Sequence, residues 1–336
     1  MLFNTMIGGK KGGAAPNGKT WTKSNITNAY INKVYNANGI WVATTSGKGI
    51  YYSTDGKTWT QSNKTNDNFS FICYADGVWA VSNSNNKGLY YSTNGKTWTQ
   101  SNINTGSFGR ICSANGTWIA TGSSNKGIYY SLDGKSWYQT DITTGHGGAM
   151  TNAKGKFFAN VWNSDGRGGI YLSTDGMKWT QSNISTGSFN SMYYANGVLV
   201  AGSVGNGLYY ATYYSYQWHW EQSNITSGNF SDLYNANGIW VACSRDSGVY
   251  YSTDGKTWTQ SNITSGSFSS VYYANGMWVL CNEDWRKNLY YSTDGKTWTE
   301  TNIDVSDYFY TVYNANGIWV AGSNKGFYYS ESYITE

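Results

Sequence analysis

The sequence of 336 residues contains one proline, two histidines, four cysteines and few charged residues, which make up 12% of the chain. The two histidines, His146 and His219, fall in different repeats on what we expect to be opposite faces, which argues against a metal site or a serine–histidine triad. No stretch has a helical period or about eighteen consecutive apolar residues, so neither helices nor membrane insertion is expected. The lysines behind the net charge of +4 stand singly, unlike the basic stripe of a nucleic-acid-binding protein. No cofactor is expected.

What the chain has in abundance is glycine, with 41 residues, and aromatic side chains, at 18%. Many of them belong to one cassette, YYSTDGKTWTQSN at residues 250–262, and versions of it return along almost the whole chain. Asp followed by Gly favours a tight turn between two strands, because Asp accepts backbone hydrogen bonds and Gly tolerates a positive φ. The cassette tryptophans recur every 38 to 42 residues, a period typical of propellers, and are Trp21, Trp59, Trp98, Trp137, Trp179, Trp220, Trp258 and Trp298.

A second turn signal lies between the cassettes. In SVYYANGMWVL, residues 270–280, the pair Asn275-Gly276 predicts a two-residue hairpin, and every repeat has a counterpart. Each repeat therefore supplies four strands, which make one propeller blade. The last repeat supplies only three strands and ends at Ser330, whereas residues 17–25 hold an isolated outer strand. We expect the N-terminal strand to complete the last blade and to remove its exposed edge.

The predicted fold is therefore all-β, an eight-bladed β-propeller of four-stranded antiparallel blades. Residues 1–16 form a flexible N-terminal arm, residues 17–332 the single propeller and residues 333–336 a tail. The blades are expected at about 26–63, 64–102, 103–141, 142–183, 184–224, 225–263, 264–302, and 303–330 with 17–25. Equivalent positions on adjacent blades lie beyond the Cα separation of about 7 Å that a disulfide tolerates. We therefore expect free, buried thiols at Cys73, Cys112, Cys243 and Cys281.

The cassette resembles the Asp-box, or BNR, repeat S-x-D-G-x-T-W of sialidases, sortilin-type receptors and photosystem-assembly-factor-like propellers. The resemblance extends from Asn17 to Ser330 and implies the propeller fold. It also implies that the box is a structural turn remote from the functional face. Asn94 and Asn17 replace the box Asp in two copies, and since an amide makes the turn without a carboxylate, these copies favour a structural role.

Positions that repeat are explained by the blade, so residues that break the repeat are the candidates for function. Loops from the second to the third strand, and from the outer strand to the next blade, share one face, which we call the variable face. There Trp162 and Trp285 each stand near an Asp and an Arg, equipment suited to sugar rings and their hydroxyls, although each ring is equally suited to cover a longer loop. We expect a site over blades six to eight, centred on Trp285 and Arg286. The expected ligand-binding residues are Trp285, Arg286, Glu283, Asp284, Arg245, Asp246, Trp162, Asp165, Arg167, Asp307, Tyr308 and Tyr310.

One distended cassette, ATYYSYQWHW at 211–220, places extra aromatic side chains on the opposite face. An exposed aromatic cluster suggests a partner contact, and local packing of a longer turn is the alternative. The residues concerned are Tyr213, Tyr214, Tyr216, Trp218 and His219.

These observations favour a non-catalytic recognition or adhesion module that binds a surface glycan or glycoprotein through the variable face. The first alternative is a structural or assembly component of a larger particle, such as a phage tail, fibre or capsid decoration, docked through residues 1–16. The second is a sialidase-like glycosidase, but the chain has only four arginines, five glutamates and no Arg-Ile-Pro sequence. The N-terminus lacks the long apolar core of a Sec signal, so we expect a virion-associated or cytoplasmic protein.

Overall fold

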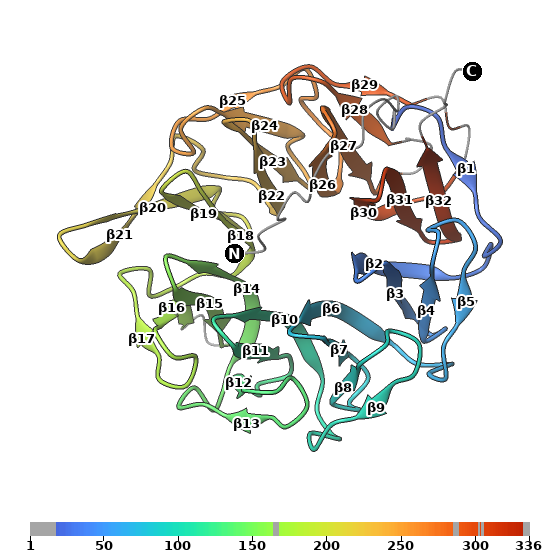
Figure 1. Cartoon of the computed structure of the whole chain (residues 1–336). Coiled ribbons are helices and arrows are strands. Elements are labelled where there is room, and N and C mark those ends of the chain that lie inside the picture. Colours follow the sequence, from blue (N-terminus) through green and yellow to red (C-terminus); the bar gives the residue numbers. More distant parts are fainter. Residues whose placement is uncertain (1–17, 164–167, 285–288, 302, 304–305, 332–336) are drawn as a thin grey trace.

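The computed structural model describes residues 18–163, 168–284, 289–301, 303 and 306–331, and its strands form eight four-stranded antiparallel sheets. The sheets surround a central axis like the blades of a propeller, with the first strand of each blade innermost (Figure 1). The predicted eight-bladed fold is confirmed. Among these residues no helix has the length and apolar character needed to cross a membrane.

The strands follow one order in every blade, from the axis outward. The innermost strands are β2 (Tyr30–Ala37), β6 (Phe69–Ala75), β10 (Phe108–Ala114), β14 (His146–Ala153), β18 (Phe189–Ala195), β22 (Phe230–Ala236), β26 (Phe268–Ala274) and β30 (Phe309–Ala315). The second strands are β3 (Ile40–Ser46), β7 (Val78–Asn83), β11 (Thr117–Gly122), β15 (Lys156–Trp162), β19 (Val198–Ser203), β23 (Ile239–Ser244), β27 (Met277–Asn282) and β31 (Ile318–Ser323).

The outer half of each blade contains the cassette. The third strands are β4 (Ile50–Ser53), β8 (Leu89–Ser92), β12 (Ile128–Ser131), β16 (Gly168–Ser173), β20 (Leu208–Tyr214), β24 (Val249–Ser252), β28 (Tyr290–Ser292) and β32 (Gly326–Glu331). The outermost strands are β5 (Thr60–Gln61), β9 (Thr99–Gln100), β13 (Tyr138–Gln139), β17 (Thr180–Gln181), β21 (Gln217–Gln222), β25 (Thr259–Gln260), β29 (Thr299–Glu300) and β1 (Thr22–Lys23).

The last blade is closed by the N-terminal strand, as predicted. Strand β1 pairs with β32, with Thr22 opposite Tyr329 and Lys23 opposite Tyr328. This pairing joins the first described residues to the last, so the ring has no open blade. The inner hairpins are also confirmed: Asn38 has φ 51° and Gly39 φ 72°, the two positive values of a type I′ turn.

The cassette turn is longer than the tight hairpin expected at Asp-Gly. Strand β4 ends at Ser53 and β5 begins only at Thr60, and side chains close the loop between them. The Asp55 carboxylate accepts the backbone N–H groups of Lys57 and Thr58, both at 2.8 Å. The Ser53 hydroxyl accepts the N–H of Gly56 at 2.9 Å. Because carboxylate and hydroxyl satisfy these amides, the box replaces a hairpin with a loop that positions its tryptophan.

The cassette asparagine fastens each blade to the next. Asn25 donates its side-chain N–H to the Trp59 carbonyl at 2.9 Å and accepts the Trp59 N–H at 2.8 Å. The same two bonds join Asn224 to Trp258. Between blades three and four Asp141 takes the place of the asparagine, and its carboxylate can only accept, which it does from the Trp179 N–H. The cassette is therefore an inter-blade connection as well as a turn.

The hydrophobic core lies between blades. Eight clusters of described residues each combine side chains of two neighbouring blades. In one of them Trp59 stacks on Phe327 of the preceding blade, with ring centroids 4.0 Å apart. The six tryptophans of the second strands, Trp41, Trp79, Trp118, Trp240, Trp278 and Trp319, are at most 1% exposed. All four cysteines are free, as expected; Cys243 and Cys281 are buried, whereas Cys73 and Cys112 are only partly so.

Candidate functional site

A polar cavity of about 430 Å³ opens where the central channel meets the variable face. Its walls come from the first residues of inner strands and the residues that end second strands, in blades one to three and six to eight. The lining residues are Tyr30, Asn32, Lys33, Ser46, Ser70, Phe71, Ser84, Arg110, Ser231, Asp232, Arg245, Ser269, Glu283 and Tyr310. Hydroxyl, amide and charged groups dominate this lining, so the cavity suits a polar ligand.

Three of the charged residues in the cavity occupy one register position. Lys33, Arg110 and Asp232 each directly precede the apolar residue that continues the inner strand, which is Val34, Ile111 or Leu233. The other five blades have Phe71, Ala149, Ser191, Ser270 and Thr311 at this position. The position therefore differs from blade to blade in a chain whose blades are otherwise alike.

Asp232 and Lys33 face the same cavity from blades six and one. The Asp232 carboxylate accepts the N–H of Leu233 at 3.0 Å and that of Val271, in the next blade, at 3.1 Å. Burial lowers the pKa of Lys33, and the nearby Asp232 charge partly opposes this shift. Two backbone bonds thus hold the carboxylate, while the ammonium group has no hydrogen bond to another described residue.

Arg110 reaches across the channel mouth. Its guanidinium lies over the ring of Phe71, 4.9 Å from the centroid, and donates to the carbonyl oxygen of Asn190 in blade five. Burial lowers the pKa of Arg110 too, although a guanidinium remains charged at any physiological pH. Its other N–H donors form no hydrogen bond with any residue that the structure describes.

The rim of the cavity combines stacked aromatic rings with an ion pair. Tyr30 and Tyr310 stack with centroids 4.4 Å apart and planes inclined by 23°. Arg245 pairs with Glu283 at 3.5 Å, and its side chain remains 49% exposed. Burial raises the pKa of Glu283, with Arg245 opposing the shift, and burial also raises the pKa of Tyr30. Aromatic faces, a guanidinium and a carboxylate therefore meet at one edge.

A belt of tyrosines lines the channel two residues deeper along the inner strands. Successive rings lie 4.8 to 5.1 Å apart from blade five to blade one, and burial raises each pKa. The rings belong to Tyr193, Tyr234, Tyr272, Tyr313 and Tyr35. Blades two, three and four have Cys73, Cys112 and Thr151 instead, so the channel wall is bulky on one side only.

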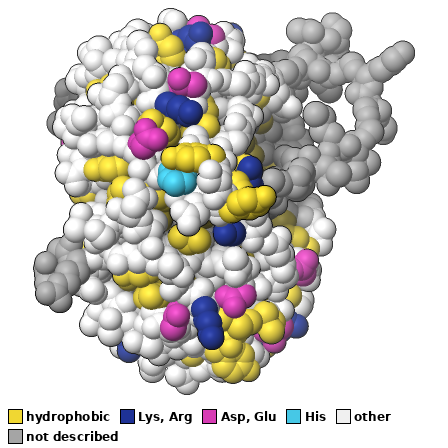
Figure 2. Space-filling model, turned by 90° about the vertical axis from the view of Figure 1, so that its left-hand side faces the viewer, with side chains coloured by type: hydrophobic (Ala, Val, Ile, Leu, Met, Phe, Trp, Pro, Cys, Tyr) yellow, Lys and Arg dark blue, Asp and Glu magenta, His cyan; other side chains and the backbone are white. Residues whose placement is uncertain are grey.

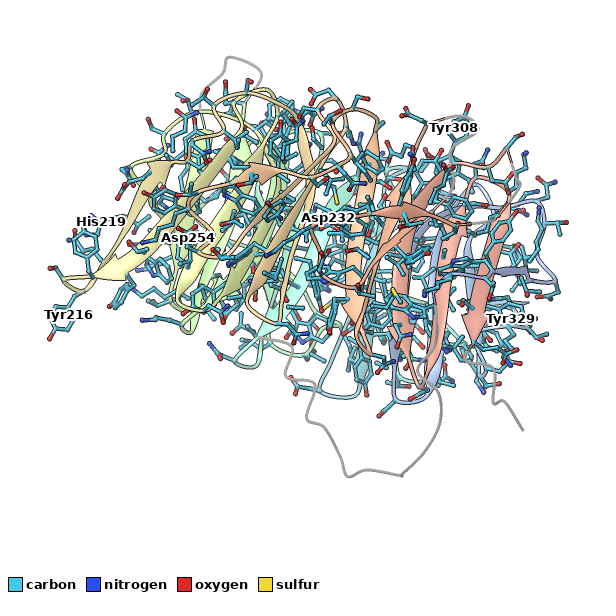
Figure 3. The ribbon with its side chains drawn as sticks, turned by 90° about the horizontal axis from the view of Figure 1, so that it is seen from above. Tyr216, His219, Asp232, Asp254, Tyr308 and Tyr329 are labelled. Atoms are coloured by element: carbon cyan, nitrogen blue, oxygen red, sulfur yellow. The ribbon has the colours of Figure 1, made fainter. Side chains whose placement is uncertain are left out.

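Of the residues that the sequence analysis proposed for ligand binding, Arg245, Glu283 and Tyr310 line the cavity. Asp246 and Asp284 hold neighbouring loop backbone in place, because their carboxylates accept the N–H groups of Asn229 and Ser267 at 3.1 and 3.0 Å. Tyr308 lies at the upper edge of the ring in this view, and Asp232 lies nearer the middle of its height (Figure 3). Trp285, Arg286, Asp165 and Arg167 lie outside the described residues.

Two of the proposed residues are placed away from the cavity. Asp307 is 3% exposed and is held by Lys325 at 2.9 Å and by the hydroxyl of Tyr328 at 2.8 Å. This buried carboxylate supports the closed blade, as Lys23 of β1 also lies 3.8 Å from it. Trp162 belongs to blade four, where it stacks on His146 with centroids 4.6 Å apart.

Four residues that line the cavity were not expected from the sequence: Lys33, Arg110, Asp232 and Tyr30. Arg110 was passed over because the other three arginines stand in loops, whereas Arg110 stands within a strand. Its signal is the register position: a comparison of the eight inner strands shows charged residues in three blades and none in the others. Residues that break the repeat are therefore candidates for function within strands as well as in loops.

The distended cassette forms the long hairpin of β20 and β21, which projects beyond the ring (Figure 1). Trp218 is buried here, 9% exposed, with Phe158 and Tyr194 at its edges. Its assignment as a partner contact is therefore wrong, because the ring fills the core between blades four and five. Tyr213 is partly buried against the same cluster.

The tip of this hairpin remains exposed. Tyr216 is 90% exposed and Tyr214 is 54% exposed and stacked on His219, with centroids 3.8 Å apart. Tyr216 and His219 extend from one end of the molecule (Figure 3). Seen from the side of this hairpin, apolar side chains surround a histidine, with charges of both signs scattered nearby (Figure 2).

Among the described residues no three His, Cys, Asp or Glu side chains gather as a metal site would require. No family model matches the sequence, and no curated protein matches it. Solved structures do match. A computationally designed protein, Ika8, is 8% identical with a TM-score of 0.74, and 93% of this chain and 98% of that chain are covered.

Two natural proteins are also similar in structure. YCF48 from Cyanidioschyzon merolae is 13% identical with a TM-score of 0.58, over 93% of this chain and 98% of that chain. BamB from Moraxella catarrhalis is 11% identical with a TM-score of 0.65, over 94% and 98%. A structure of YCF48 bound to D1 peptide has a TM-score of 0.60 at 15% identity, over 96% and 99%. At these identities the likeness concerns the fold, a β-propeller.

Proposed function

We propose that this propeller is a non-catalytic recognition module that binds surface carbohydrate at the mouth of its central channel. The observation that supports the proposal most is the rim, where the stacked rings of Tyr30 and Tyr310 stand beside the Arg245–Glu283 ion pair. Aromatic faces stack on sugar rings, and paired charged groups exchange hydrogen bonds with sugar hydroxyls. The serine and asparagine side chains of the wall extend the same chemistry inward.

A glycan array tests this proposal, with wild type compared with Tyr310→Ser. Serine is the residue of blades six and seven at the same register position, Ser231 and Ser269, so the variant should fold. We expect wild type to bind defined glycans and the variant to lose most of that binding. Absence of any bound glycan would contradict the proposal, and retained binding by the variant would move the site elsewhere. Trp285→Ala tests in the same assay whether that residue contributes.

The proposal includes the absence of catalysis. Asp232 and Glu283 are the two carboxylates of the cavity, and each is already engaged, by backbone N–H groups and by Arg245 respectively. Neither is therefore free to act as an acid or a nucleophile without losing its present partner. We expect no turnover of a fluorogenic sialoside or of neutral aryl glycosides, and measurable hydrolysis that requires Glu283 would contradict this.

A second candidate function, assembly into a larger particle, is favoured by the tip of the β20–β21 hairpin. Tyr216 is 90% exposed at a turn that projects from the ring, a position suited to insertion into a partner protein. One of the similar propellers, YCF48, has itself been solved bound to a peptide, D1. The N-terminal arm of residues 1–16, proposed for docking, lies outside the described residues.

Particles assembled in the presence of three proteins would test this candidate: wild type, Tyr216→Ser and a variant lacking residues 1–15. We expect all three to stay folded, and a docking role predicts that one of the two changes abolishes co-sedimentation with the particle. Equal co-sedimentation of all three would contradict docking through either segment.

A further inference from the structure

The inner part of the cavity carries more positive than negative charge. Its charged lining residues are three cations, Lys33, Arg110 and Arg245, and two anions, Asp232 and Glu283. Arg245 and Glu283 pair with each other at the rim and cancel. The remaining three share one register position deeper in the channel, and together they leave one positive charge unbalanced.

Burial lowers the pKa of both deep cations, and the charge of Asp232 acts on each of them and raises its pKa by less. Within the described part of the chain neither Lys33 nor Arg110 forms an ion pair, and Arg110 donates only to a neutral carbonyl oxygen. Asp232 is engaged by two backbone N–H groups, from Leu233 and Val271. Partly buried cations with spare donors are costly unless an anion balances them. Burial lowers the pKa of Lys33, which is the sign of that cost.

The position itself does not require charge. Serines stand there in blades five and seven and a threonine in blade eight, and all three are buried within the blade wall, at most 4% exposed. The lysine and arginine are instead only partly buried and face the cavity. Two blades therefore replace a small wall residue with a long cation that reaches into the channel, which the fold does not need.

We propose that the cavity selects acidic glycans and that Lys33 and Arg110 together bind the carboxylate or sulfate group of the sugar seated there. This inference rests on the proposed carbohydrate-binding function and adds the charge class of the ligand. The ligand anion accepts hydrogen bonds from the ammonium group of Lys33 and the free edge of the Arg110 guanidinium. The stacked tyrosines at the rim contact an adjoining sugar ring. Asp232 limits the strength of binding, because it repels the same anion.

Matched pairs of ligands test the charge. Oligogalacturonates carry a carboxylate on each ring and their methyl esters do not, while dextran sulfate and dextran form the corresponding sulfate pair. We expect at least one charged member to bind at least about tenfold more tightly than its neutral partner, which is the usual loss for one charge-assisted hydrogen bond. The pair that shows the difference identifies carboxylate or sulfate as the anion.

Matched variants test the residues, and each substitution introduces a residue that another blade already has at that position. Lys33→Thr and Arg110→Ser should each weaken the charged ligand about tenfold and flatten its salt dependence. Asp232→Ser should strengthen it. Lys154→Asn is the control, because it removes one positive charge at an inner hairpin of the opposite face, where six blades have Asn. It should leave affinity unchanged.

The outcomes separate this inference from the proposed function. If in both pairs the neutral member binds as tightly as its charged partner, the charge selectivity is wrong and glycan recognition stands. If Asp232→Ser weakens binding together with the cation variants, the three residues are a structural cluster and the inference is overturned. If neither charged nor neutral glycans bind, the proposed function fails and the inference fails with it.

Discussion

The cassette turns and the channel mouth lie at opposite ends of the blades and differ in how their residues repeat. At most cassettes the same carboxylate, asparagine and tryptophan recur with the same bonds, at 2.8 Å in Asp55, Asp254 and Asp294 alike. At the channel mouth one register position holds Lys33, Arg110 or Asp232 in three blades, and uncharged residues, from Ala149 to Phe71, in the other five. Eight equal copies build a ring, whereas one asymmetric ligand requires unequal blades.

The largest effect on stability should follow from a change in a cassette, whose residues repeat around the ring. Trp258 is 3% exposed and packs between blades five and six, so Trp258→Ala leaves a cavity in the core. We expect a loss of about 3–5 kcal/mol in the free energy of unfolding. Urea denaturation followed by circular dichroism measures it. Tyr310→Ser is the matched test at the channel mouth. It should lower the free energy of unfolding by less than about 1 kcal/mol, while the protein loses most of its glycan binding. If Trp258→Ala and Tyr310→Ser destabilised the protein equally, the cassette and the channel mouth would not differ in their structural role.

A smaller effect is expected from the inter-blade asparagines. Asn224→Ala removes two bonds to the Trp258 backbone and should destabilise the ring by about 1–3 kcal/mol. The connection from blade three to blade four provides the opposite test, because the side chain of Asp141 offers no donor to the Trp179 carbonyl. Asp141→Asn should stabilise by up to about 1 kcal/mol. Both values come from the same denaturation experiment, and a destabilising Asp141→Asn would show that the carboxylate is adapted to its blade.

The box carboxylates predict how stability depends on pH. For Asp254 burial alone would raise the pKa, but hydrogen bonds from the Thr257 and Lys256 amides outweigh burial, and the pKa is lowered. A carboxylate with a lowered pKa in the folded state stabilises the protein above its unfolded value, near 4, and this contribution is lost as the pH falls through the folded pKa. The same shift occurs at Asp55, Asp133, Asp175 and Asp294.

We therefore expect the thermal midpoint to fall steeply below about pH 4. Asp254→Asn, which copies the natural Asn94, should make that fall shallower and cost about 0.5 kcal/mol at pH 7, a small value because solvent screens an exposed carboxylate. Thermal scans from neutral to acidic pH measure both effects. An unchanged pH profile would mean that the boxes do not govern acid stability.

The ring was predictable from the sequence because its causes are local and repeated. Asn-Gly pairs adopt the two positive φ values that a type I′ turn requires. A tryptophan equivalent to Trp258 stands in each cassette, where one blade joins the next. The closure of the last blade was predictable because the last repeat has three strands and the N-terminal segment supplies one more. The cassette loop differed from its prediction because Ser and Asp side chains, which satisfy backbone amides, allow a longer turn than Asp-Gly alone.

The site was predictable only in part, since it depends on what the ring brings together. Arg245 and Glu283 were predicted because they stand in loops where the other blades have different residues. Lys33 and Arg110 are 77 residues apart in the sequence, within strands of ordinary appearance, and only closure of the ring directs both into one cavity. The prediction for Trp218 was wrong because a residue that does not repeat can still belong to the core: its ring packs on Phe158 of the neighbouring blade.

Another small effect is expected at the tip of the β20–β21 hairpin, which belongs neither to the cassette turns nor to the channel mouth. Ser215 and Tyr216 have φ values of 49° and 63°, a type I′ turn in which the eight inner hairpins place Gly second and, in six, Asn first. A bulky residue there costs energy, so Ser215→Asn with Tyr216→Gly should raise the free energy of unfolding by about 0.4–1 kcal/mol. Denaturation measures the gain. If the change stabilises the ring and also abolishes co-sedimentation with a particle, then Tyr216 occupies a strained position for the sake of a partner; if stability does not rise, the tip is simply a tolerated turn and the docking role loses its physical argument.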